Sequence, residues 1–248
     1  MRNVCLLFAA LSLPSAMAAS KAQTNPELVE KVERAIAKFE QTERQHWAYT
    51  LSRFENEEGE ITSSIERFEP NLQSSDNWFL EQINGETPTA KQQREFKDKK
   101  REQAQKKQNK EKKGSEKKGK NNFSIALREL ILADTLHFVT ESPSHIEMGF
   151  DVQIEKLGDE ASEQLQGQLS YNKQNAFIEE IEITNRGEFS PMFSAMITEL
   201  KLNLYFTMLN GQVLPTQKDM IMKGTFAFFT EIDEVSSDTF SDYRYMEP

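Results

Sequence analysis

Hydrophobic and polar residues alternate at helical spacing near the start of the chain. Asn25-Pro26-Glu27 combines a capping residue, a proline suited to the first helical position and an acid for the first turn. Leu28, Val32, Ile36 and Phe39 follow at spacings of four, four and three, so they share one face. The pattern predicts an amphipathic helix whose apolar face covers another surface.

The period then changes from that of a helix to that of a strand. Trp47, Tyr49 and Leu51 alternate with polar residues, and Ile61, Ser63 and Ile65 continue beyond a Glu57–Glu60 turn, which predicts a hairpin. A third strand, 78–83, ends in Asn84-Gly85, a tight-turn signal. Thr89 and Gln92 then form a capping box before a Lys-, Gln- and Glu-rich stretch over 90–113, for which we predict a solvated helix that fades into disorder through Gly114–Lys120.

In the second half of the chain, the spacing of Phe123, Leu127, Leu130 and Ile131 predicts a short helix, and the alternation that follows predicts a long antiparallel meander. Phe177, Ile181 and Ile183 share a face. The expected strands are 135–141, 145–156, 164–171, 176–186, 195–208 and 218–235. Asn210-Gly211 turns the chain between the last two of them. Two further faces are predicted. One holds Met196, Leu200, Leu202, Leu204, Phe206 and Met208; the other holds Met220, Met222, Phe226, Phe228 and Ile232. Short turns between successive strands favour an α+β fold, a curled antiparallel sheet covered by helices.

Charge separates one segment from the rest. Lys91–Lys120 holds 14 basic and 5 acidic residues, whereas residues 19–90 and 121–248 together hold 15 basic and 35 acidic ones. Clustered lysines are attracted to anionic membrane surfaces, so we predict a transient contact of this segment with phospholipid or lipopolysaccharide headgroups. A solvated insertion is the alternative interpretation. The acidic body and the lack of aromatic residues among the lysines argue against a nucleic-acid partner.

Met1–Ala18 has the pattern of a cleaved signal peptide. An arginine precedes the apolar run Val4–Leu13, and Ala16-Met17-Ala18 places small residues at the positions that signal peptidase reads. We predict cleavage after Ala18 and a periplasmic mature chain, with one domain over 19–248 carrying the basic insertion 91–120. Cys5 is the only cysteine of the 248 residues and lies inside the signal, so the mature chain is predicted to lack disulfides and cysteine metal sites.

Catalytic motifs are not apparent. His46, His137 and His145 lack ligand spacing, and no nucleophile elbow, zinc-protease motif or phosphate-binding loop occurs. We therefore predict a protein that is not an enzyme and needs no metal or cofactor.

Phenylalanine and methionine side chains suit either a core or a pocket for a lipid. Alternation along a strand does not distinguish residues that line a cavity from residues of a packed core. The candidate ligand-binding residues are Phe177, Ile181, Leu202, Leu204, Phe206, Phe226 and Phe228. Replacing Phe206 and Phe228 with alanine distinguishes a cavity from a core. If the two residues line a cavity, the substitutions should weaken lipid binding more than they lower stability; if they are core residues, the two losses should be equal.

The order of features resembles that of the LolA/LolB-like periplasmic proteins. The features are a signal peptide, an amphipathic helix, Trp78…Ile83-Asn84-Gly85 with Pro88-Thr89 before a charged helix, and a meander ending near Ser241–Arg244. The resemblance implies an unclosed half-barrel of about eleven antiparallel strands around an apolar cavity, and a partner that is a lipid or an acylated protein. It leads us to predict a lipid or lipoprotein carrier. The alternative is an envelope interaction module whose filled core leaves its charged surfaces to dock a protein.

Overall fold

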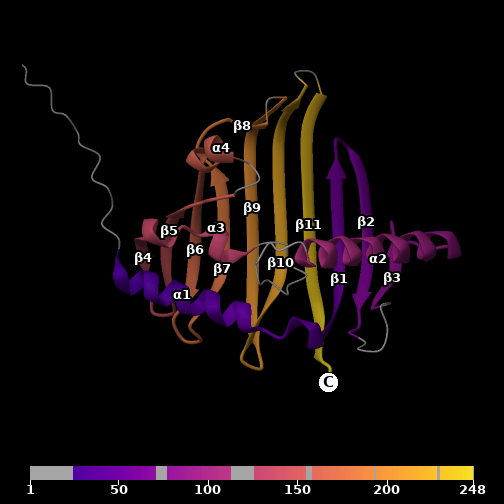
Figure 1. The fold of residues 1–248 in the computed structure, drawn as a ribbon, viewed down its shortest axis with the longest axis horizontal. Coiled ribbons are helices and arrows are strands. Elements are labelled where there is room, and N and C mark those ends of the chain that lie inside the picture. Colours follow the sequence, from indigo (N-terminus) through magenta and orange to yellow (C-terminus); the bar gives the residue numbers. More distant parts are fainter. Residues whose placement is uncertain are drawn as a thin grey trace, which may run out of the picture.

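The computed structural model describes residues 25–70, 77–112, 126–154, 158–192, 194–227 and 230–247 (Figure 1). The predicted signal peptide, Phe123, the predicted disorder over Gly114–Lys120 and the candidate ligand residue Phe228 lie outside these residues.

Eleven strands form one antiparallel sheet that is curled and not closed (Figure 1). The order is β3-β2-β1-β11-β10-β9-β7-β6-β5-β4, and β8 pairs with β9 beside this path. The strands are β1 Trp47–Glu57, β2 Glu60–Phe68, β3 Trp78–Ile83, β4 His137–Glu141, β5 His145–Asp151, β6 Leu165–Asn172, β7 Phe177–Asn185, β8 Phe189–Met192, β9 Ala195–Leu209, β10 Gln212–Phe226 and β11 Thr230–Tyr245. The predicted antiparallel meander of an α+β fold is confirmed.

The helical segments are α1 Pro26–Gln41, η1 Arg44–His46, α2 Ala90–Lys112, α3 Leu127–Leu130, η2 Ala133–Thr135 and α4 Gly158–Gln164. In Figure 1, α1 runs across the lower ends of β7, β9 and β10, while α2 runs across the other half of the sheet near β3. No helix among the described residues is long and apolar enough to cross a membrane.

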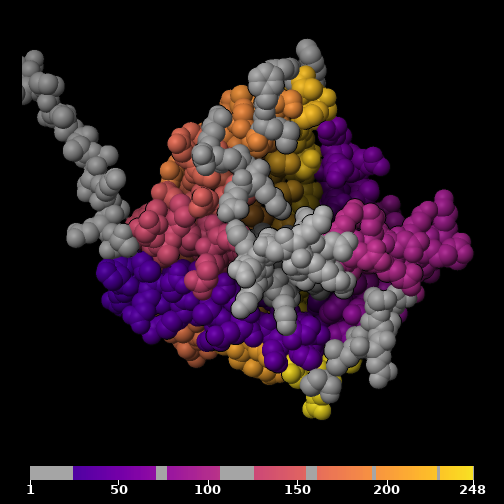
Figure 2. Space-filling model, viewed as in Figure 1, coloured from indigo at the N-terminus to yellow at the C-terminus, as the bar shows by residue number. Residues whose placement is uncertain are grey.

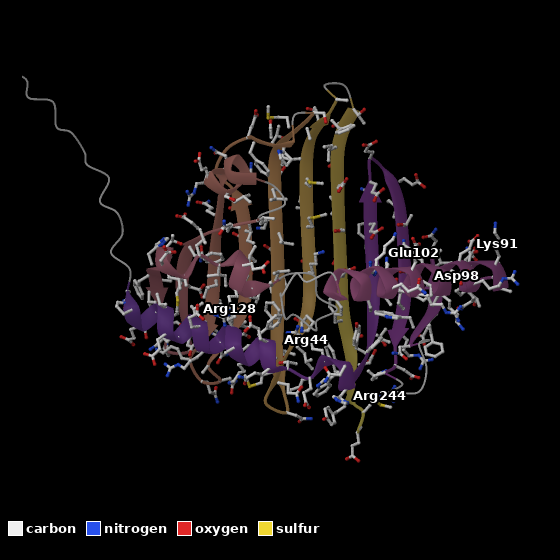
Figure 3. The ribbon with its side chains drawn as sticks, viewed as in Figure 1. Arg44, Lys91, Asp98, Glu102, Arg128 and Arg244 are labelled. Atoms are coloured by element: carbon white, nitrogen blue, oxygen red, sulfur yellow. The ribbon has the colours of Figure 1, made fainter. Side chains whose placement is uncertain are left out.

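The predicted first helix is confirmed. Asn25 caps it, since its side chain accepts a hydrogen bond from Glu27 N at 3.0 Å, and Pro26 occupies the first turn. The predicted apolar face is buried, with Val32 and Ile36 at most 1% exposed. Arg128 of α3 forms ion pairs with Glu33 and Glu40 on one flank of α1 (Figure 3).

The predicted turns are confirmed by their backbone angles. Asn84-Gly85 and Asn210-Gly211 both have positive φ at each residue, as the tightest hairpin turns require. The capping box is confirmed as well: Thr89 N donates to Gln92 Oε1 at 2.8 Å, and Gln92 N donates to Thr89 Oγ1 at 3.3 Å. Thus α2 begins where the sequence predicts.

We call the face of the sheet that α1 covers the inner face, and the strand register shows which side chains lie on it. Leu204 lies opposite Lys218, Lys218 opposite Asp238, and Asp238 opposite Arg53, so these four side chains share this face across β9, β10, β11 and β1. Leu204 belongs to the core beneath α1. One face of the sheet therefore changes from apolar to charged within four strands.

Two predictions about the last strands are wrong. The expected single strand 218–235 is two strands, because the chain turns at Ala227 between β10 and β11. Met196 does not share a face with Leu200, because a register shift between Lys223 and Gly224 against β9 inserts an extra residue. Ile197 is buried in the core instead, at 4% exposure, and Met196 is 40% exposed.

Candidate functional site

The covered part of the inner face is a packed core. Phe206 meets Phe39 of α1 edge to face, with ring centroids 5.2 Å apart. Leu204, Ile181 and Phe177 are at most 3% exposed. The structure thus brings Ile181, Leu204 and Phe206 together on this face. Phe177 is buried in the same core, but a bulge in β7 places Ile178 instead of Phe177 on the face of Ile181, so the predicted common face of Phe177, Ile181 and Ile183 is wrong.

Beyond α1 the same face carries partly buried apolar side chains. We call this set the inner trough: Leu200 and Leu202 of β9, Met220 and Met222 of β10, and Ile232 of β11. Leu202 lies opposite Met220, and Leu200 opposite Met222, so the side chains form two adjacent rows. In the space-filling view the upper parts of β10 and β11 are recessed beside the purple β1–β2 hairpin (Figure 2).

Two further candidate residues relate to this trough. Leu202 is one of its members, and Phe226 continues the same side of β10 at its upper end with 45% exposure. Between Met220 and Phe226 the strand rises by roughly 20 Å at about 3.4 Å per residue. The trough and Phe226 together therefore form an apolar strip of roughly that length along β10.

A cluster of charges borders the trough on the β1–β2 side. Arg53 Nε lies 3.4 Å from Glu66 Oε1 and 3.7 Å from Asp238 Oδ1. Lys100 of α2 reaches the other Glu66 oxygen at 2.5 Å, and the Glu66 side chain is only 7% exposed. Burying these charges is tolerated because each carboxylate has a cation beside it.

Burial alters the protonation of this cluster. It raises the pKa of Asp238 above the ordinary aspartate value, and the positive charges of Arg53 and Lys218 offset this only in part. Burial also lowers the pKa of Lys100, which the neighbouring Glu66 opposes. The boundary between the apolar and charged parts of the inner face is therefore poorly solvated.

The raised pKa of Asp238 gives a testable pH dependence. At pH values between the pKa of Asp238 in the unfolded chain and its higher pKa in the folded protein, the folded state holds a proton that the unfolded state has lost. The free energy of unfolding therefore falls as pH rises through this range. Asp238→Asn should abolish this decrease in the free energy of unfolding. We expect the variant to be as stable as the parent at neutral pH, or more stable by about 1 kcal/mol. Urea unfolding across pH measures it, with exposed Asp242→Asn as control. A clear loss of stability would instead mean that the pair with Arg53 is net stabilising.

Aromatic side chains fill the lower end of the β1–β3 side. Tyr49 contacts Phe68 and Tyr243 with ring centroids 5.2 and 5.7 Å away, and Phe68 contacts Trp78 at 5.1 Å. Arg44, the first residue of η1 just beyond α1 (Figure 3), stacks on the Phe39 ring at 3.7 Å, and burial lowers its pKa to about 10. Its Nη2 donates to the Phe39 carbonyl at 2.9 Å. Arg44 thus fixes the end of α1, and the aromatic rings pack β1, β2, β3 and β11 together.

The basic helix α2 is attached to the sheet by one side. Lys100 Nζ lies 3.9 Å from the Trp78 ring, and Gln93 Nε2 donates to the Leu80 carbonyl at 2.6 Å. On its solvent side cations alternate with acids, as Lys91, Asp98 and Glu102 show in Figure 3. Ion pairs link Lys91 to Glu95, Arg101 to Asp98 and Lys106 to Glu102. The described part of this surface therefore carries a smaller excess of positive charge than the segment as a whole.

A half-open pocket lies apart from the trough, between the first turns of α1 and the edge of the sheet at β4, β5 and β6. Its volume is about 460 Å³. The lining residues are Asn25, Glu27, Leu28, Lys31, Arg34, Phe138, Glu141, Ile146, Tyr171 and Lys173. None of these was a candidate from the sequence. The spacing of Leu28 predicted burial, but no pattern indicated that distant strands would meet beside it.

Comparison with known proteins adds one structural similarity. No protein-family model matches the chain, and a search of curated proteins finds no match. The chain is similar to the crystal structure of a DUF1329 family protein from Desulfovibrio piger ATCC 29098, with a TM-score of 0.34 and 10% sequence identity over 88% of this chain and 92% of that one. The description of that protein names no ligand and no activity.

Proposed function

We propose that the protein binds a lipid or acyl chain along the inner trough without altering it, as a periplasmic carrier would. The observation that supports this is the row of partly buried leucine and methionine side chains that continues the core beyond α1. Along β10 the apolar strip extends toward exposed Phe226, and on β11 it is bordered by Ser236 and Glu234, which lie opposite Met220 and Met222.

The side chains of the trough suit a ligand of variable shape. Methionine is unbranched and flexible, so Met220 and Met222 can adjust to chains that differ in length or saturation. Removing apolar surface from water contributes about 25 cal/mol per Å². The neighbouring Lys218 and Arg53 lie on the same face and can donate hydrogen bonds to the polar end of a ligand whose tail occupies the trough.

Native mass spectrometry of the full chain, followed by organic extraction, tests this proposal. We expect a phospholipid or acylated peptide to remain bound at about one per chain, or to be acquired from phospholipid vesicles. Met222→Lys places a charge in the trough and should weaken lipid binding at least tenfold, which corresponds to about 1.4 kcal/mol.

The fold supplies a matched control. Met196→Lys changes the same residue type on the opposite face of β9, where Met196 is already 40% exposed, and should leave lipid binding unchanged. Urea unfolding of both variants separates loss of binding from loss of structure. A chain that stays empty after incubation with vesicles, or equal binding by both variants, would contradict the proposal and favour the interaction module.

A further inference from the structure

The pocket beside α1 has an apolar floor. Leu28 of α1 and Ile146 of β5 are 5% and 6% exposed, and Phe138 of edge strand β4 is 53% exposed although it lines the pocket. Ile146 lies opposite Tyr171 of β6. The volume of about 460 Å³ falls within the range typical of small-molecule sites.

Tyr171 is the polar group of that floor. It is 5% exposed and lines the pocket, and its hydroxyl makes no hydrogen bond with any other residue that the structure describes. The hydroxyl oxygen itself is not among the fully buried side-chain atoms that lack a partner, so it is accessible from the pocket. A ligand in the pocket can supply that partner.

Cations outnumber carboxylates around the opening. Lys31, Arg34 and Lys173 line it together with the two acids Glu27 and Glu141. Each of these cations also has a carboxylate partner: Lys31 contacts Glu27 at 2.6 Å, Arg34 contacts Glu30 at 3.2 Å, and Lys173 contacts Glu141 at 2.5 Å. The pocket also lies at the positive, N-terminal end of α1, whose dipole favours a negative charge there. Because Glu30 offsets the one extra cation of the lining, the preference of the opening for an anion rests on the dipole of α1.

We propose that this pocket is a binding site for a small carboxylate with an aromatic or short aliphatic body. The body packs against Phe138, Ile146 and Leu28, the carboxylate lies near Lys31 and Lys173, and the Tyr171 hydroxyl donates to it. The pocket and the trough share no residue, so this site does not depend on the lipid-binding proposal.

Titration of the full chain with naphthoate, followed by calorimetry, tests the site. Tyr171→Phe removes only the hydroxyl and should weaken naphthoate binding at least tenfold, and Lys173→Gln by a similar factor, the size of one lost hydrogen bond to a charged group. Naphthamide, which has the same body without the charge, should bind at least fivefold more weakly than naphthoate.

Matched controls come from the outer face of the sheet. Tyr205→Phe and Lys201→Gln change the same residue types far from the pocket; Lys201 is paired with Glu182 at 2.6 Å, much as Lys173 is with Glu141. Both should bind naphthoate like the parent, as should the trough variant Met222→Lys. No binding, equal binding of naphthamide, or a loss caused by Met222→Lys with none from Tyr171→Phe would overturn the proposal.

Discussion

Replacing Phe206 with alanine should lower the free energy of unfolding by about 3–5 kcal/mol. Phe206 is 6% exposed, and its ring meets Phe39 of α1 edge to face. Truncation removes apolar burial, leaves a cavity between α1 and β9, and loses the aromatic contact. Urea unfolding followed by circular dichroism measures the change.

Phe54→Ala is the matched control for this truncation. Phe54 lies on β1 with 39% exposure, so its loss should cost less than about 1 kcal/mol. If Phe206→Ala cost no more than Phe54→Ala while lipid binding fell sharply, Phe206 would line a ligand cavity and α1 would act as a movable cover.

Gly224→Ala should destabilise the protein by about 1–3 kcal/mol. A Cβ at this position of β10 would overlap the carbonyl oxygen of Met196, which belongs to the backbone and cannot move aside like the end of a side chain. The overlap falls at the register shift that turns Met196 outward and Ile197 inward. We expect faster amide hydrogen exchange in this part of β9 together with the lower urea midpoint.

Gly187→Ala provides the control for the glycine substitution. The added Cβ there would meet only the flexible side-chain end of Gln164, at 2.9 Å, so we expect a change within about 0.5 kcal/mol. Equal effects of the two substitutions would show that the backbone of β9 can shift away from Gly224 without cost.

Local patterns predicted much of the fold because their causes are local. The Asn25 cap, the Asn210-Gly211 turn and the Thr89–Gln92 capping box each depend on residues a few positions apart. Alternation located most strands within a few residues of their ends. It failed where an extra residue enters a strand: Met196 and Ile197 exchange faces, and the bulge in β7 places Ile178 instead of Phe177 on the face of Ile181.

The candidate sites were harder to predict because they depend on which elements cover the sheet. Leu202 and Leu204 have the same residue type and share a face, yet only Leu204 is fully buried. The Glu66–Lys100 pair joins residues 34 positions apart, and the pocket joins Lys31 to Lys173. Such meetings follow from the path of the whole chain and leave no periodic signal.

The pairing of β1 with β11 has a consequence for the order in which the sheet can be completed. Trp47 lies opposite Tyr245, nearly the full length of the described chain away. The strands β1, β2 and β3 are synthesised before the other described strands, yet among these strands they join the rest of the sheet through β11, which is synthesised after the other ten. Closing so long a loop is slow, so the exposed edge of β1 must stay unpaired until Thr230–Tyr245 emerges. A chaperone that shields that edge during this interval would protect the nascent chain from aggregation.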